Sequence, residues 1–289
     1  MPSTMITVAP TGAETAKSDA PALPCSLDEL VSTAKACQAA GAALIHVHVR
    51  DAQAQPTLDL GYVHAAIAAV REATDLIVQV SSGGAVSDSE DARVAVLDSE
   101  PDGASLTCGT VNFGTDVFLN RWELIERLYL AMREREIVPE FELFDLGHIA
   151  TMKRLLDRHG APYGGHVHCD LVMGVPGGMP GTLAAVAACV AALPREATWS
   201  ATGVGRSSVP VMFAALADGG HLRVGMEDTL TFAPGRPVRD NAELVERAAS
   251  LATTAQRPPM SIDDARTMLG IKERRSATTD SIVAGTGAG

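Results

Sequence analysis

The sequence has few aromatic residues and little positive charge for its 289 residues. Phe, Trp and Tyr make up 4% of the chain, which argues against a platform of rings for stacking nucleic-acid bases. Lys and Arg number 23 against 35 Asp and Glu, and the formal net charge is -12. A broad basic surface for nucleic acid or for an anionic membrane is therefore not expected.

Cysteine and long apolar runs are also scarce. The five cysteines are scattered, and no two have the Cys-x-x-Cys spacing of a zinc knuckle or a redox motif. A disulfide-stapled secreted domain is therefore not expected, and we predict a reducing, cytoplasmic location. The segment MPSTMITVAP has neither the basic nor the apolar region of a secretory signal, and no run reaches the roughly 18 apolar residues of a membrane span.

Short apolar, β-branched runs recur eight times, and each is followed by a longer stretch with helical periodicity. Runs of this kind are typical of parallel strands that helices cover. The candidate strands occupy residues 5–10, 44–49, 76–81, 103–107, 138–144, 167–173, 197–202 and 221–225. The candidate helices occupy residues 27–41, 60–73, 89–99, 121–136, 147–159, 181–193, 207–218, 240–254 and 261–269.

Eight strand–helix units in series predict an α/β fold, a (β/α)8 TIM barrel. The first helix has a capping-box pattern, Ser26 with Glu29 three residues later, and Gly41 closes it. We expect a single catalytic domain over residues 1–274. Residues 275–289 are small and polar without a period, and this predicts a flexible C-terminal tail.

A doubly wound Rossmann sheet is the alternative fold. It favours a Gly-x-Gly-x-x-Gly turn after the first strand, whereas this chain has Pro-Thr-Gly-Ala-Glu at residues 10–14. The sequence Gly-Val-Gly-Arg at residues 203–206 is only a fragment of that motif.

Two histidines interrupt the second candidate strand. His46 and His48 are two residues apart, so their side chains share one face of the strand. In a TIM barrel the active site lies where the strands end. Two imidazoles at such a place can bind a divalent metal such as zinc, and a pair of buried, hydrogen-bonded histidines is the alternative.

A second His-x-His pair competes for the role of metal ligand. His166 and His168 stand at the beginning of the sixth candidate strand, far from the catalytic end of the barrel. We therefore favour the first pair.

The eighth candidate strand ends in an unusual group of charged residues. Arg223 is followed by the adjacent carboxylates Glu227 and Asp228. Adjacent residues point in different directions, so one carboxylate can complete a two-His, one-carboxylate metal site while the other acts as a base oriented by the arginine. A surface carboxylate pair that caps the next loop is the alternative interpretation.

The ends of other candidate strands are polar as well. Hydroxyls and backbone N–H groups that suit an anion follow the third strand. Together the strand ends predict a polar, acidic cup around one cation. Its further members are Glu14, Ser81, Ser82, Gly83, Ser105, Thr107 and Glu142.

In this order, these motifs resemble the beta-keto acid cleavage enzymes over about residues 5–270. The matching segments are Thr-Gly-Ala-Glu at 11–14, Gly-Ala-Ala-Leu-Ile-His-Val-His-Val-Arg-Asp at 41–51, Gln-Val-Ser-Ser-Gly-Gly at 79–84, Gly-Thr-Val-Asn-Phe-Gly at 109–114, Pro-Glu-Phe-Glu at 139–142, Gly-Val-Pro-Gly-Gly at 174–178, Gly-Val-Gly-Arg at 203–206 and Gly-Gly-His-Leu-Arg-Val-Gly-Met-Glu-Asp at 219–228.

The resemblance implies a zinc-dependent, homotetrameric TIM-barrel enzyme. A β-keto acid and acetyl-CoA would condense and separate by a retro-Claisen step into acetoacetate and a new acyl-CoA. His46, His48 and Glu227 would hold Zn2+, and Arg223 with Asp228 would remove a proton from the keto acid. Ser81 would help to stabilise oxyanions. Substrate binding would fall to Glu14, Ser82, Gly83, Ser105, Thr107 and Glu142.

The two outlying carboxylates suggest a substrate class. Glu14 and Glu142 favour a keto acid that carries an amine or a quaternary ammonium, such as 3-keto-5-aminohexanoate. Lys17 and Arg206 are basic candidates for contacts with CoA. A metal-dependent aldolase or hydrolase on the same barrel is the alternative activity, and a metal-dependent binding protein is a non-catalytic one.

Overall fold

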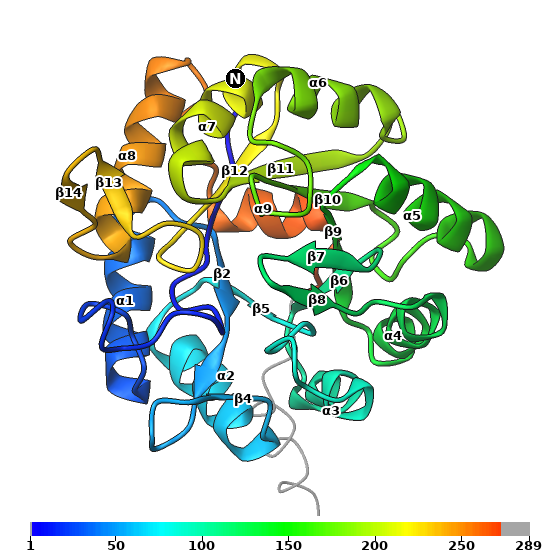
Figure 1. Cartoon of the computed structure of the whole chain (residues 1–289), viewed down its shortest axis with the longest axis horizontal. Helices are drawn as coiled ribbons and strands as arrows, with labels where there is room; N and C mark the ends of the chain where they lie inside the picture. Colours follow the sequence, from blue (N-terminus) through cyan, green and yellow to red (C-terminus); the bar gives the residue numbers. More distant parts are fainter. Residues whose placement is uncertain (1, 273–289) are drawn as a thin grey trace, which may run out of the picture.

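The computed structural model describes residues 2–272 and has a closed barrel of eight parallel strands, as the sequence predicts (Figure 1). The barrel closes where β1 pairs with β12, with Thr7 opposite Arg223. In chain order the barrel strands are β1 (Ile6–Val8), β2 (Leu44–Val47), β5 (Ile77–Val80), β6 (Gly103–Thr107), β9 (Val138–Leu143), β10 (His168–Met173), β11 (Thr198–Gly203) and β12 (His221–Val224).

Helices form a ring around these strands (Figure 1). The predicted capping box of α1 is present, since Ser26 Oγ accepts from the Glu29 amide and Glu29 Oε2 accepts from the Ser26 amide. The predicted helix over 89–99 ends as a tighter 3-10 turn, η1 (Val96–Ser99). The helices of the ring are α1 (Leu27–Ala40), α2 (Leu60–Ala73), α3 (Glu90–Ala95), α4 (Trp122–Glu134), α5 (Leu146–His159), α6 (Leu183–Ala192), α7 (Ser208–Ala217) and α8 (Asn241–Thr254).

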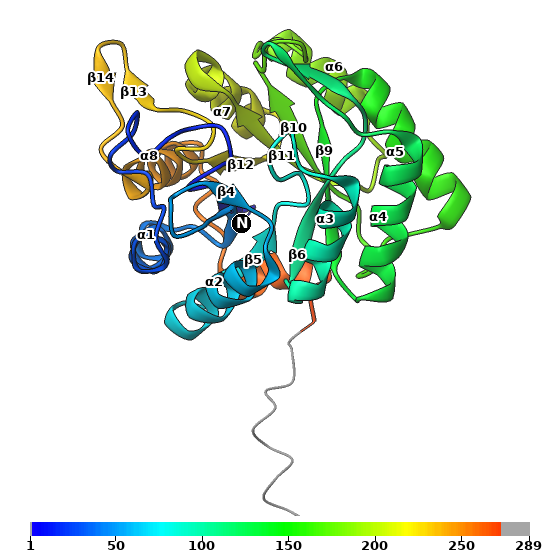
Figure 2. The same cartoon turned by 60° about the horizontal axis from the view of Figure 1, so that its bottom comes forward.

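A further helix, α9 (Ile262–Leu269), covers the end of the barrel where the strands begin (Figure 2). Its Ala265 and Leu269 are buried with Met5, Leu44 and Ile77, which stand just before or at the starts of three strands. The opposite end is left open for a site. The predicted tail at 275–289 lies outside the described residues.

The barrel strands divide their side chains between an apolar outer face and a polar interior. Ile45 and Val47 of β2 belong to the main hydrophobic core under the helices, whereas His46 between them is buried beside Gln79 of β5. The same alternation runs through β9 and β10. Because buried polar groups need hydrogen-bond partners, the interior is a bonded network. Its buried members include Ser105, Glu140, Glu142, His168, Asp170, Ser200, Thr202 and Arg223.

Three small antiparallel hairpins follow barrel strands and form part of the rim at the open end. They pair β3 (Val49–Arg50) with β4 (Pro56–Thr57), β7 (Val111–Phe113) with β8 (Asp116–Phe118), and β13 (Thr231–Ala233) with β14 (Arg236–Pro237). Their strands of two or three residues are too short for a periodic sequence signal, and the sequence did not predict them. Among the described residues, every helix is too short or too polar to cross a bilayer.

Candidate active site

The two histidines of the first His-x-His pair meet one carboxylate across the mouth of the barrel. His46 lies on β2 and His48 follows it at the break before β3. His46 Nε2 is 3.9 Å from Glu227 Oε1, and His48 Nε2 is 3.8 Å from Glu227 Oε2. The structure therefore brings these three predicted side chains together, although His48 and Glu227 are 179 positions apart in the sequence.

Two glycines let the Glu227 turn approach β1. A Cβ on Gly225 would lie 1.9 Å from the Ala9 carbonyl oxygen, and one on Gly12 would lie 2.7 Å from Glu227 Cγ. Gly12 also has φ +64°, a conformation that favours glycine. The amide of Glu227 donates to Ala9 O at 3.2 Å. Close packing against the β1 end thus fixes where the carboxylate points.

His46, His48 and Glu227 fit a divalent metal. One ligand atom from each lies within 4.8 Å of the others, and among residues 2–272 they are the one group of three or more His, Cys, Asp or Glu with such spacing. Glu227 Oε2 is buried without a hydrogen-bond partner among the described residues, so it is an acceptor without a donor. Two nitrogens and one oxygen with room for further ligands are a donor set typical of catalytic zinc.

The protonation of the imidazoles agrees with metal binding. His46 Nδ1 lies 2.5 Å from Gln79 Oε1, an acceptor, so the proton of the neutral ring sits on Nδ1 and the Nε2 lone pair faces Glu227. Burial lowers the pKa of His48 to about 4, so this ring is neutral near pH 7. Both rings therefore present lone pairs for a metal.

Arg223 binds three carboxylates within the barrel mouth. Its Nη1 is 3.2 Å from Glu142 Oε1, its Nη2 is 3.2 Å from Asp228 Oδ1, and Nη2 also contacts Glu227 Oε1. Burial alone would lower the pKa of Arg223, but Asp228, Glu227 and further carboxylates raise it well above its usual value. The guanidinium is therefore a fixed positive charge that orients the acids around it.

The two adjacent carboxylates have different proton affinities. Burial raises the pKa of Asp228 to about 6, aided by the negative charge of Glu227 and opposed by Arg223. For Glu227, burial acts upward as well, but Arg223 and the two imidazoles outweigh it and lower its pKa to about 2. Glu227 is thus suited to bind a cation, while Asp228 is suited to exchange a proton near neutral pH.

These groups line a cavity of about 260 Å³ at the open end of the barrel. Ser81 and Gly83 line it too, and the Gly83 amide donates to Ser81 Oγ at 3.2 Å, which leaves the Ser81 hydroxyl hydrogen to donate elsewhere. The exposed Glu14 reaches the cavity from the loop after β1. Arg50 holds that loop, because its Nη2 donates to the carbonyls of Gly12 and Thr15.

The structure places three other predicted substrate-binding residues behind this lining. Ser82 Oγ donates to the Ser105 carbonyl at 2.5 Å, and Ser105 Oγ accepts from the Ser82 amide. Thr107 Oγ1 donates to Glu142 Oε2 at 2.8 Å. Ser82, Ser105 and Thr107 thus brace the strands that carry Ser81 and Glu142, and they stand outside the cavity lining.

The second His-x-His pair lies elsewhere, as expected. His166 Nε2 and His168 Nδ1 both contact Thr198 Oγ1, at 2.7 and 2.8 Å. His168 Nε2 is 3.4 Å from Glu140 Oε2, one level deeper in the barrel than Glu142. This pair belongs to the bonded interior.

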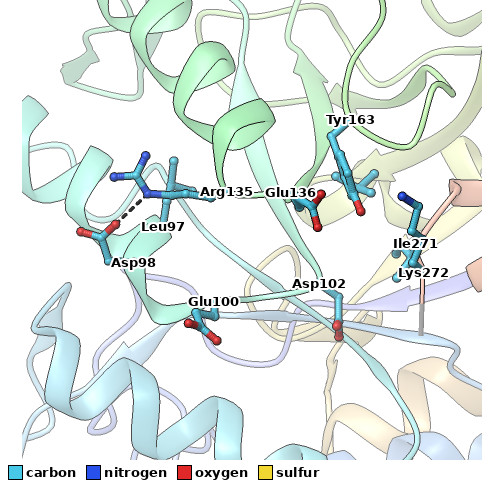
Figure 3. Close-up of a pocket in the computed structure, with 10 residues that line it drawn as sticks. Leu97, Asp98, Glu100, Asp102, Arg135, Glu136, Tyr163, Ile271 and Lys272 are labelled. Atoms are coloured by element: carbon cyan, nitrogen blue, oxygen red, sulfur yellow. Dashed lines mark hydrogen bonds and ion pairs between the residues drawn. The ribbon is translucent and has the colours of Figure 1, made fainter. Parts of the chain in front are cut away.

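A larger cavity, of about 660 Å³, lies where the strands begin (Figure 3). It has acidic side chains, Asp98, Glu100, Asp102 and Glu136, and Arg135 Nε binds Asp98 Oδ1 at 2.7 Å. Its residues precede β6, β9 and β10 or follow α9. It is thus at the opposite end of the barrel from His46 and Glu227.

Sequence reasoning missed two contributors to the site. Gln79 is a lone amide in an apolar strand, and its polarity was a usable signal. An apolar wall with Phe113, Phe118 and Phe144 also lines the cavity, and no role for these rings was predicted from the sequence.

Comparison with known proteins decides the family. The sequence pattern of the beta-keto acid cleavage enzymes matches residues 3–271. The chain belongs to the beta-keto acid cleavage enzyme family. It is 36% identical over 275 residues to a 3-keto-5-aminohexanoate cleavage enzyme of Acetoanaerobium sticklandii, covering 93% of this chain and 98% of the relative. It is 34% identical over 271 residues to a 3-oxoadipate:acetyl-CoA acetyltransferase of Cupriavidus necator, covering 92% and 94%.

Solved structures agree on the fold. The apo structure of ObcA superposes with a TM-score of 0.76 at 19% identity, covering 87% of this chain and 66% of that one. At that identity the likeness concerns the barrel alone. The family member described here is thus an enzyme built on a TIM barrel with its candidate site at the carboxyl ends of the strands.

Proposed function

We propose that this enzyme is a zinc-dependent β-keto acid:acetyl-CoA cleavage enzyme, which forms acetoacetate and a new acyl-CoA. The observation that carries the proposal is the meeting of His46, His48 and Glu227 beside the Arg223–Asp228 pair. The relatives named for 3-keto-5-aminohexanoate, 3-oxoadipate and 3-dehydrocarnitine support the substrate class and the thioester partner.

The proton transfer belongs to Asp228. A carboxylate with a pKa of about 6 can take a proton from the carbon between the keto and carboxylate groups of a β-keto acid. Arg223 holds this carboxylate through Nε and Nη2, so the base keeps its orientation. Zinc bound by His46, His48 and Glu227 would supply a Lewis acid that favours the enolate.

Exchange of the carbon–carbon bonds follows the loss of this proton. The enolate carbon forms a bond to the acetyl carbonyl carbon, and the CoA thiolate leaves. The thiolate adds to the original keto carbon, and the bond between that carbon and the enolate carbon breaks. Acyl-CoA forms, and the released acetoacetate carbanion takes back the proton. The Ser81 hydroxyl can donate to a developing oxyanion during these steps.

The charge balance of the cavity supports a resident cation. Its lining has four carboxylates, Glu14, Glu142, Glu227 and Asp228, against the single guanidinium of Arg223. A substrate carboxylate entering this group would be repelled, and a divalent ion offsets that repulsion.

Of the two carboxylates expected to bind a substrate ammonium, only one remains a candidate. Glu142 binds Arg223 and Thr107, so its charge is already engaged. Glu14 has no hydrogen bond or ion pair within residues 2–272 and faces the cavity. If Glu14 binds an ammonium, Glu14→Gln lowers kcat/KM for 3-keto-5-aminohexanoate selectively, whereas equal effects on 3-oxoadipate would contradict this role.

The contacts with CoA also stay a proposal. Lys17 Nζ is held by the Leu23 carbonyl and by Glu29 Oε1 at 2.7 Å, so it has little freedom for a phosphate. Arg206 is exposed on the turn after β11 and is the better candidate. Arg206→Gln should raise KM for acetyl-CoA and leave KM for the keto acid unchanged.

Metal dependence and products test the main proposal. Purified enzyme should contain a stoichiometric divalent ion, and acetoacetate should form from a β-keto acid only with acetyl-CoA. His46→Ala should lose both the metal and the activity. Product formation without acetyl-CoA would favour the alternative, a metal-dependent aldolase or hydrolase. A metal-free protein with full activity would overturn the zinc assignment.

We also propose that the chain assembles through α6 and α7, consistent with a homotetramer. Helix α6 has no polar side chain from Leu183 to Ala192, and Leu183 is 65% exposed. Phe213 on the neighbouring α7 is 56% exposed. A helix that is apolar all round is normally covered. Phe213→Glu should lower the sedimentation coefficient, and an unchanged value would exclude this surface.

A further inference from the structure

One side of the active-site cavity is an apolar wall. It is built by Phe113, Phe118, Phe144, Val172, Val175 and Val204. These side chains belong to a hydrophobic cluster that is separate from the main core of the barrel. The chain has six phenylalanines in all, and three of them stand here. Half of the phenylalanines in a chain that has few therefore line this one cavity.

Contacts around the three rings fix their positions. Phe113 packs edge-on against both Phe118 and Phe144, with ring centroids 6.3 Å apart in each pair. The Arg93 guanidinium lies over the Phe118 ring at 4.8 Å. Its nitrogens donate to the carbonyls of Ser82 and Leu119 and to Asn120 Oδ1, so its hydrogen bonds are made away from the cavity. The wall is thus a formed surface with no charge directed into the cavity.

The wall begins directly beside the reacting groups. A Cβ on Gly83 would lie 3.1 Å from Phe118 Cζ and 3.3 Å from Ser81 Oγ, so this glycine touches both the wall and the hydroxyl. Glu142 is the penultimate residue of β9 and stands two residues before Phe144. A keto acid whose carboxylate and keto oxygen lie near His46 and Ser81 would place its remaining carbons against the rings.

We propose that this wall selects β-keto acids with an uncharged, apolar group on the keto carbon, such as a straight or branched alkyl chain. The inference rests on the proposed function and narrows its substrate class, and it opposes the ammonium-bearing substrate that Glu14 alone would favour. A carboxylate on this group would lose its hydration against the rings without gaining a partner, and an ammonium would regain only part of its lost hydration energy from a ring face. An alkyl group would gain from burial, by about 3- to 4-fold in kcat/KM for each added methylene until the cavity is full.

A matched pair of substrates tests this directly. In 5-methyl-3-oxohexanoate a methyl group replaces the amine of 3-keto-5-aminohexanoate. With acetyl-CoA in excess, we expect kcat/KM to be at least 10-fold higher for the methyl compound, and to rise from 3-oxopentanoate to 3-oxohexanoate. A preference for the amino compound or for 3-oxoadipate would overturn the inference.

Binding measurements separate this inference from the proposed function. Calorimetric titration of the zinc-loaded enzyme with the two acids should show the methyl compound binding more tightly. If neither acid is turned over, the proposed function fails, and the titration still decides the role of the wall. Equal or weaker binding of the methyl compound would overturn it.

Two variants test whether the wall causes the preference for alkyl substrates. Phe113→Ser should lower kcat/KM for the alkyl acid about 10-fold and leave KM for acetyl-CoA unchanged. The matched control is Phe232→Ser, which removes a half-buried ring from the β13 hairpin outside the cavity. Val204→Thr keeps the shape of the wall and adds a hydroxyl, so it should weaken the alkyl preference in a folded protein. If these variants raised only the KM for acetyl-CoA, the wall would bind acetyl-CoA and not the keto acid, and the inference would be wrong.

Discussion

The Nδ1 atom of His46 lies 2.5 Å from Oε1 of Gln79, its register partner on the neighbouring strand β5. The amide oxygen can only accept, so it fixes the imidazole proton on Nδ1 and turns Nε2 toward Glu227. Gln79 is 2% exposed, so its amide is shielded from solvent. One side chain outside the candidate ligand set thus determines how a candidate metal ligand is presented.

Removing this acceptor should weaken metal binding. We expect Gln79→Leu to lower zinc affinity about 10- to 100-fold. Gln79→Glu, which still accepts from Nδ1–H, should restore most of it. Gln38→Leu on helix α1 is the control, because Gln38 bonds Asp75 at the surface. Competition with a chromophoric chelator gives the affinities, and equal values for Gln79→Leu and the control would refute the role.

Neutralising the proposed base should stop proton transfer without loss of metal. Asp228→Asn should lower kcat by about 10²- to 10⁴-fold. It should also abolish exchange of the keto-acid α-proton with D2O, which NMR follows without acetyl-CoA. Metal content should match that of the unmodified enzyme. Asp218→Asn, at the exposed end of α7, serves as the control. Retained exchange in Asp228→Asn would assign the base elsewhere.

Steric crowding of the Glu227 side chain should lower metal affinity. The Cβ of Gly12→Ala would lie 2.7 Å from Glu227 Cγ, so Glu227 must shift and metal affinity should fall. Gly114→Ala is the control, because Gly114 has nearly the same φ, +66°, and no heavy atom within 4 Å of its added Cβ. It should lose about 1–2 kcal/mol of stability and keep its metal. Equal metal loss in both variants would point to backbone strain alone.

A buried histidine outside the site should make the fold sensitive to acid. His221 Nδ1 accepts a hydrogen bond from the Met5 amide at 3.0 Å, so the ring is held neutral, and burial lowers its pKa to about 3. The unfolded chain has the ordinary value of about 6.5 and binds more protons between these pH values. The stability that comes with the neutral His221 ring is therefore fully present above about pH 6.5, and it is lost as the pH falls toward 3.

This loss can be measured by denaturant unfolding between pH 7 and pH 4. Down to pH 4 the loss is about 3.5 kcal/mol at most, since about 2.5 pH units lie below 6.5 and each is worth about 1.4 kcal/mol. His221→Gln, which keeps an acceptor but does not titrate, should flatten the pH dependence. His64→Gln replaces an exposed histidine of α2 and should leave the curve unchanged. An identical slope in the His221 variant would contradict the assignment.

The barrel and the residues that meet at its candidate metal site were readable in the sequence for a physical reason. Parallel strands covered by helices are near-continuous apolar runs, so polar side chains inside them stand out, as His46 and His48 do. Glu227 and Asp228 could be placed because the carboxyl ends of all barrel strands share one rim. These predictions depend on periodicity and topology, which the sequence determines locally.

Partners across the barrel could not be predicted in the same way. Ser105 and Thr107 stand on an inward face as expected, but which of them meets Glu142 depends on strand register. Glu142 was expected to be free for a substrate ammonium, but it forms an ion pair with Arg223. This partner could not be predicted because the two residues lie far apart in the sequence. The aromatic wall depends on a hairpin, β7–β8, too short for a periodic signal.

The pairing of β1 with β12 has a consequence for how the protein is made. The candidate metal site needs histidines from the second strand and a carboxylate from the turn after the last one. During synthesis His46 and His48 leave the ribosome long before Glu227. Strand β1 can pair with β2 early, but it can pair with β12 only after β12 has been synthesised. High-affinity metal binding at this candidate site would therefore be a late event, and metal retention would report that the barrel has closed.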